Sequence, residues 1–176
     1  MKNSWLFLAF VTLTVLTLAT LRMGAASVQP TSETYSWSGE LVAFDAGGRT
    51  LTVKSRVVGD QALAELPRFT KGDRIVLTWS GFDTYGDGIS RTVRYDAAKK
   101  WSGPFTFPVE FVMYEAPPRQ YVTFTVTVPA SSAAPLASVK PGEWVTVISK
   151  HRASSEAEAI TAVNAYTATA SRASSE

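Results

Sequence analysis

The sequence predicts an all-β fold, an antiparallel barrel or sandwich of about six to eight strands preceded by one N-terminal hydrophobic helix. Two observations support this prediction. First, a polar corner centred on glycine leads into an apolar run twice, at residues 71–79 (KGDRIVLTW) and 140–150 (KPGEWVTVISK). This pattern is typical of a loop that leads into a strand at the rim of a sheet. Second, residues 121–128 (YVTFTVTV) alternate strictly between polar or tyrosine and apolar side chains, as a half-buried strand does.

The composition allows one folded domain whose charges balance. Of the 176 residues, 45% are hydrophobic, enough to bury one core of about 150 residues once the N-terminal segment is set aside. The formal charge of +2 comes from Lys2 and Arg22, because residues 27–176 contain 15 Lys and Arg against 15 Asp and Glu. A nucleic-acid binder needs a basic excess to contact phosphates, so we expect no nucleic-acid partner.

Residues 1–26 predict a transmembrane anchor or a signal peptide. No charged residue lies between Asn3 and Leu21, and this apolar run is longer than the core of a usual signal peptide. A retained anchor and a leader cleaved after the small residues 24–26 both stay open. If the helix is retained, we expect these side chains to contact the membrane: Trp5, Phe7, Phe10, Thr12 and Leu16.

The predicted location of the domain is extracytoplasmic. Lys2 and the α-amine should stay inside, which places residues 27 onward outside the cytoplasm, in the periplasm and anchored in the inner membrane, or secreted if the leader is cleaved. The chain has no cysteine, so its core alone must stabilise it. This combination fits a bacterial envelope protein.

The domain is expected to span residues 37–167, between a linker at 27–36 and a flexible tail at 168–176. Its first two strands form a hairpin, residues 38–45 and 49–54, because Gly47 and Gly48 supply the conformations that a tight connection needs.

The next segments alternate loops and strands. Residues 57–70 are expected to be a loop with at most one short helix, because their apolar stretch is too brief for a long one. The strand at 74–79 follows the first glycine corner, and a glycine-rich loop follows at 81–88. In the short strand at 89–95 we expect Ile89, Val93 and Tyr95 to share one face.

The second half of the chain adds four expected strands. Residues 109–114 and 121–128 are partners, and residues 144–149 follow the second glycine corner after a Ser/Ala/Pro connection. Residues 159–167 form the last strand. Residues 80–120 are an elaboration between the two turn-and-strand units.

Five short segments resemble a known group of domains: GELVAFD (39–45), TLTV (50–53), KGDRIV (71–76), KPGEWVTV (140–147) and AITAV (159–163). Together they resemble the small OB-like β-barrel domains of unknown function in bacterial envelope proteins. The resemblance covers roughly half of residues 37–167 and implies a closed or nearly closed antiparallel barrel, with no catalytic residues to carry over. Whether the two turn-and-strand units are two half-barrels or parts of one barrel stays open.

The aromatic segment from Trp101 to Tyr121 is the candidate partner-binding site. Aromatic side chains bury large areas at low entropic cost and are frequent in interfaces. The competing interpretation is that they form the core, since aromatic residues in strands usually pack inside. The candidate partner-binding residues are Trp101, Phe105, Phe107, Phe111, Tyr114 and Arg119.

Signals for catalysis or metal binding are weak. Residues 83–88 (DTYGDG) resemble a calcium loop, but Tyr85 and Arg94 stand where oxygen ligands are needed, so a plain turn is favoured. His151, flanked by Lys150 and Arg152, is expected to be a solvated loop residue. Without a cysteine nucleophile, a phosphate-cradling glycine motif or paired carboxylates, we expect no enzymatic activity, no cofactor and no metal.

Two functions remain as expectations. The first is a non-enzymatic accessory or scaffolding subunit, tethered to the membrane on its extracytoplasmic side, that docks on the protein subunits of a larger membrane complex through residues 80–120. The alternative is a secreted β-barrel module that binds an oligosaccharide or another small molecule.

Overall fold

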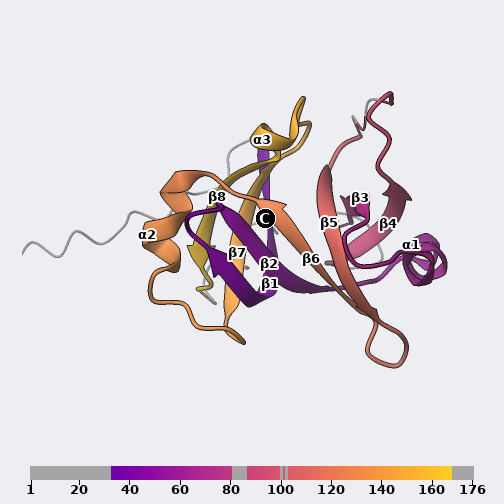
Figure 1. Cartoon of the computed structure of the whole chain (residues 1–176), viewed down its shortest axis with the longest axis horizontal. Helices are drawn as coiled ribbons and strands as arrows, with labels where there is room; N and C mark the ends of the chain where they lie inside the picture. The colour runs from indigo at the N-terminus through magenta and orange to yellow at the C-terminus, as the bar shows by residue number, and fades with distance from the viewer. Residues whose placement is uncertain (1–32, 81–86, 100, 102, 168–176) are drawn as a thin grey trace, which may run out of the picture.

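The structure is a computed structural model that describes residues 33–80, 87–99, 101 and 103–167 (Figure 1). Eight strands of these residues form one antiparallel sheet in the order β4-β3-β5-β6-β2-β1-β7-β8. The strands are β1 (Thr34–Asp45), β2 (Thr50–Arg56), β3 (Arg74–Trp79), β4 (Ile89–Arg94), β5 (Thr106–Glu115), β6 (Tyr121–Thr127), β7 (Trp144–Lys150) and β8 (Ile160–Ala165). The connections contain short helical segments: α1 (Asp60–Glu65), η1 (Leu66–Arg68), η2 (Ala130–Ser132), α2 (Ala133–Leu136) and α3 (Glu156–Ala159).

The predicted antiparallel β fold is confirmed, and of the barrel or sandwich that the sequence left open, the structure has one sheet that is not closed into a barrel. The two edge strands, β4 and β8, do not pair with each other. Helix α1 packs against β4 and α2 packs against β8, at the two ends of the sheet (Figure 1). A glycine corner specifies where a strand begins, but closure requires the edge strands to meet, and here a helix lies beside each edge.

Several predicted segments lie outside the described residues. These include the anchor or signal peptide with Trp5, Phe7, Phe10, Thr12 and Leu16, most of the glycine-rich loop, and the tail at 168–176. None of the helices in the described part of the chain is long and apolar enough to span a membrane. Strand β1 begins at Thr34, three residues before the expected start of the domain.

The order of elements repeats once along the chain. A long strand, a partner strand, a short helical segment, a glycine turn and two further strands occur as β1 to β4 and again as β5 to β8. The glycines of the two turns, Gly72 and Gly142, lie 70 positions apart and both have a left-handed backbone, with φ of +92° and +91°. An L-residue with a Cβ is strained in this region, which explains a glycine at both places.

The first turn docks on β5 through main-chain hydrogen bonds. The carboxylate of Asp73 accepts the Thr70 N–H at 2.8 Å, which closes the turn. The Gly72 N–H donates to the Phe111 carbonyl at 2.9 Å, and the Phe111 N–H donates to the Asp73 carbonyl at 2.8 Å. Immediately after Phe111, the pairing of β5 with β6 shifts by one residue in a bulge.

The second turn makes the same contacts with β1. The carboxylate of Glu143 accepts the Lys140 N–H at 2.9 Å. The Gly142 N–H donates to the Leu41 carbonyl and the Leu41 N–H donates to the Glu143 carbonyl, both at 2.8 Å. The pairing of β1 with β2 shifts immediately after Leu41, so the bulge is repeated as well. The glycines coincide in the two copies, whereas Lys71 and Lys140 are one position out of step.

The two halves are interlocked rather than side by side. Strand β1 pairs with β7 of the second half, and β5 pairs with β3 of the first half. If each strand is replaced by its equivalent in the other half (β1 by β5, β2 by β6, β3 by β7, β4 by β8), the strand order read from one edge equals the order read from the other. At the centre, Val53 of β2 lies opposite Phe124 of β6, and these two residues occupy equivalent positions in the repeat. A pseudo-twofold axis passes between them, so the two turn-and-strand units are halves of one sheet.

The ion pair of Asp73 with Arg94 predicts that the folded domain loses stability at acidic pH. Hydrogen bonds from the Arg94 guanidinium and the Thr70 N–H lower the pKa of Asp73 to about 2. Because this pKa lies below the unfolded value of about 3.9, the stabilisation is present above pH 4 and is lost as the pH falls toward 2. We expect Asp73→Asn to be less stable at pH 7 and to show a flatter melting temperature between pH 4 and pH 2, measured by circular dichroism. Parallel pH curves for the two proteins would contradict the role of Asp73.

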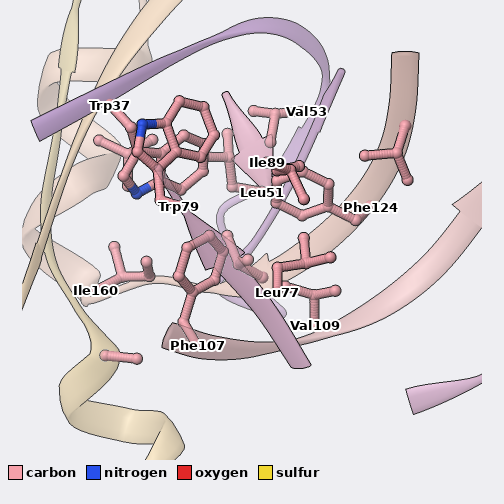
Figure 2. Close-up of a cluster of buried hydrophobic side chains, with 14 of the residues drawn as sticks. Trp37, Leu51, Val53, Leu77, Trp79, Ile89, Phe107, Val109, Phe124 and Ile160 are labelled. Carbon is pink, nitrogen blue, oxygen red and sulfur yellow. The ribbon is translucent and has the colours of Figure 1, made fainter. Parts of the chain in front are cut away.

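The core lies inside the curled sheet and contains residues of both halves (Figure 2). Trp37 of β1 stacks on Phe107 of β5, with ring centroids 5.2 Å apart and planes 8° apart. Its centroid is also 5.1 Å from that of Trp79 and 5.8 Å from that of Phe124. The Trp37 Nε1–H donates to Ser149 Oγ at 2.8 Å, which satisfies its buried donor.

The outer edge of β4 is covered by main chain at its start, where the Val58 N–H donates to the Ile89 carbonyl at 2.9 Å, and by a side-chain amide further along. Gln61 of α1 accepts the Thr92 N–H at Oε1 and donates from Nε2 to the Thr92 carbonyl, both at 2.8 Å. The glutamine thus imitates a neighbouring strand at a main-chain position that is buried. Such a cap blocks pairing of the edge with another chain.

Removing this cap should destabilise β4. In Gln61→Ala both polar main-chain groups of Thr92 lose their partner, so we expect the free energy of unfolding to fall by about 1–3 kcal/mol. Gln61→Glu keeps the acceptor and loses the donor, so its loss should be smaller. Urea unfolding and hydrogen exchange of the Thr92 amide measure both effects. Unchanged protection of that amide in Gln61→Ala would show that the cap is unimportant.

Candidate functional site

The structure does not bring the six predicted partner-binding residues into one site. Phe107 and Phe111 are buried in the core, so their prediction as partner contacts is replaced by the core interpretation. Trp101, Phe105 and Tyr114 are half-buried, and all three pack against the same core. Arg119 is exposed in the connection between β5 and β6, where it pairs with Glu115 at 3.3 Å.

Phe105 and His151 form an aromatic contact where the two halves meet. The Phe105 N–H donates to the His151 carbonyl at 2.8 Å, and Phe105 has a left-handed φ of +57°. The His151 ring lies edge-on to Phe105, with centroids 4.7 Å apart, and 5.6 Å from Tyr35. His151 lies in a loop, as expected, but it is half-buried rather than solvated, because its ring packs against two aromatic side chains. Burial raises the pKa of Tyr35.

Trp101 lines a groove on the outer face of β3, β4 and β5, the face opposite the core. Its volume is about 210 Å³. The lining residues are Val76, Thr78, Arg91, Thr92, Val93, Trp101, Gly103 and Thr106.

The groove combines an apolar row with a polar row. Val76 of β3 lies between Val93 of β4 and Pro108 of β5, which gives an apolar strip across three strands. Val76 is buried, whereas Val93 is 50% exposed. An exposed valine beside a half-buried tryptophan is a surface that a partner can cover.

The polar row lies two residues further along the same strands. Thr78 of β3 lies between Arg91 of β4 and Thr106 of β5. The Thr106 hydroxyl donates to the carbonyl of Gly103 at 2.8 Å or that of Trp101 at 3.3 Å, so it fixes the loop that presents the indole. Arg91 is exposed, and its side chain has no hydrogen bond or ion pair to any described residue.

The internal repeat shows that this groove belongs to one half only. The second half places Ile148, Ala162 and Asn164 at the positions that Thr78, Arg91 and Val93 occupy in the first. These three residues are buried. The shared features of the two halves are therefore the turns and the core, and the groove is a feature in which they differ.

Sequence reasoning missed Val76, Arg91 and Val93 as site residues. It placed Ile89 and Val93 on one face, but the pairing of β3 with β4 shifts between Thr78 and Trp79, which leaves Ile89 in the core and Val93 outside. One available signal was the continuous apolar run from residue 75 to 77, because an unbroken run places an apolar residue on both faces of a strand.

A second exposed aromatic surface lies at the other end of the sheet. Trp144, at the start of β7, is 45% exposed, and Tyr166, just after β8, is 42% exposed. Their ring centroids are 6.5 Å apart. Sequence reasoning did not select either residue, although Trp144 directly follows the second glycine corner.

The described residues contain no cluster of His, Asp and Glu side chains that could hold a metal ion. Residues 83–86 of the calcium-like loop lie outside the described part. Asp87, its last acidic residue, accepts a hydrogen bond from the Trp79 indole, and burial raises the pKa of Asp87.

Comparison of the chain with protein-family models, curated proteins and solved structures gives no match.

Proposed function

We propose that this protein is a non-enzymatic accessory subunit that docks on a larger membrane complex through the groove beside Trp101, on the outer side of the cytoplasmic membrane. The observation that carries the proposal is the groove itself, with Val93 exposed next to a tryptophan held by Thr106. The groove is formed by β3 and by parts of residues 80–120, the segment in which the sequence predicts a partner site.

Tethering by the N-terminal segment supports this function further. Residues 3–21 carry no charge, and a retained helix would hold the domain close to other membrane subunits. A tether raises the local concentration of the domain, so a shallow groove can give stable association without a large interface.

The test compares two tryptophans that are both partly exposed. The full-length protein is extracted from its native membranes in mild detergent as wild type, Trp101→Ala or Trp144→Ala, and the co-purifying subunits are quantified. We expect Trp101→Ala to lose the companion subunits and Trp144→Ala to retain them. Full occupancy of a folded Trp101→Ala variant would refute docking through this groove.

The Trp144–Tyr166 pair favours a second candidate, a secreted module that binds an oligosaccharide. Exposed aromatic rings stack on the apolar faces of sugar rings, and these two rings lie together on the surface. Quenching of tryptophan fluorescence by soluble oligosaccharides, abolished in Trp144→Ala and kept in Trp101→Ala, would support it. An intact mass that includes residues 1–26, together with the absence of quenching, would exclude it.

A further inference from the structure

Arg91 differs from the neighbouring arginines of the sheet. Arg94 pairs with Asp73 at 2.9 Å, and Arg74 pairs with Glu156. Arg91 makes no ion pair in the described residues and lines the groove beside Trp101. A guanidinium presents a planar fork of donors that matches the oxygens of a carboxylate or a phosphate, so an uncompensated arginine in a groove favours an anionic occupant.

The spacing of the groove defines a second requirement. Arg91 and Val93 lie two positions apart on the outer face of β4, because they pair with Thr78 and Val76 respectively. Alternate residues of a strand are about 7 Å apart, which is also the spacing of alternate side chains in an extended peptide. A bound segment can therefore present an apolar side chain to Val93 and a carboxylate to Arg91 at the same time.

We infer that the occupant of this groove is an acidic segment of a partner protein, in which an Asp or Glu lies close in sequence to an apolar side chain. This inference rests on the proposed docking function and names the chemistry of the partner. The cap that Gln61 places on β4 means that the segment binds the outer face and does not add a strand to the edge.

A photo-crosslinking experiment tests the inference in the full-length protein in native membranes. The photoreactive residue p-benzoylphenylalanine replaces Val93, and the adduct is digested and mapped by mass spectrometry. The Val93 replacement is also made in proteins that carry Arg91→Lys, Arg91→Gln or Arg91→Glu. Urea unfolding checks that each of these proteins is folded. Val42 is the matched control position. It is 40% exposed, lies in the bulge where β1 pairs with β2, and is outside the groove.

We expect the peptide crosslinked at position 93 to contain an Asp or Glu within about three residues of the attachment point. Arg91→Gln should reduce the adduct yield about tenfold, and Arg91→Glu should abolish it. Arg91→Lys should give an intermediate yield, because it keeps the charge and loses the planar fork. Changing the mapped acid of the partner to Lys should restore the adduct of Arg91→Glu.

Two outcomes would overturn the inference, and they are distinguishable. An adduct at position 93 on a segment without an acid, with a yield unaffected by Arg91→Gln, would refute the acidic partner and leave docking intact. The absence of any adduct at position 93 would refute both the docking function and the inference.

Discussion

Trp37→Ala is expected to lower the free energy of unfolding by about 3–5 kcal/mol, the usual loss when a large buried aromatic side chain is truncated. Trp37 is 1% exposed and contacts Phe107, Trp79 and Phe124, which come from both halves of the repeat. Its removal therefore leaves a cavity at the point where the halves share one core. Urea unfolding followed by tryptophan fluorescence and far-UV circular dichroism measures the loss.

Trp37→Phe is the control for this prediction. It keeps a stacked ring against Phe107 and loses the indole hydrogen bond to Ser149, so its loss should be clearly smaller than that of the alanine variant. Two separate unfolding transitions in Trp37→Ala would contradict a shared core, because they would mean that the halves fold independently.

The second large effect concerns the predicted partner residues that lie in the core. Phe107→Ala should lose about 3–5 kcal/mol of stability, because Phe107 is 1% exposed and packs on Trp37 and Phe124. Trp101→Ala should lose clearly less stability than Phe107→Ala, because Trp101 is half-buried and packs only against the margin of the core. Thermal melts of both variants separate the core role from the surface role. Similar losses in the two variants would contradict the distinction.

Local patterns predicted the strands well because they depend on short-range chemistry. The alternation of residues 121–128 predicted β6, and the two glycine corners predicted the starts of β3 and β7. Gly72 and Gly142 carry this information themselves, since a backbone φ near +90° strongly favours a residue without a Cβ.

Long-range pairing could not be predicted in the same way. Nothing in the sequence of β1 indicates that its partner is β7 rather than β3, since both strands follow the same kind of turn. The shift at Trp79 that separates Ile89 from Val93 also depends on pairing, and it decides which side chains line the groove. The candidate site was therefore predicted at the level of a segment, through Trp101, and not at the level of its surface.

The domain consists of two interlocked copies of one four-stranded unit. A circular permutant tests this arrangement most directly. In the natural order, residues 95–105 join β4 to β5, whereas no connection joins β8 to β1. In the permutant, a linker of equal length joins Ala165 to Thr34, and the new ends lie between Ala97 and Ala98.

Because the two connections are equivalent under the pseudo-twofold axis, the permutant should keep the near-UV circular dichroism of the Trp37 cluster and melt in a single transition close to that of the natural order. A matched permutant opened between Lys71 and Gly72 breaks a docked turn and should melt at a lower temperature. If the first permutant fails to form the native tertiary signal while the second does form it, the claim of two equivalent interlocked units is contradicted.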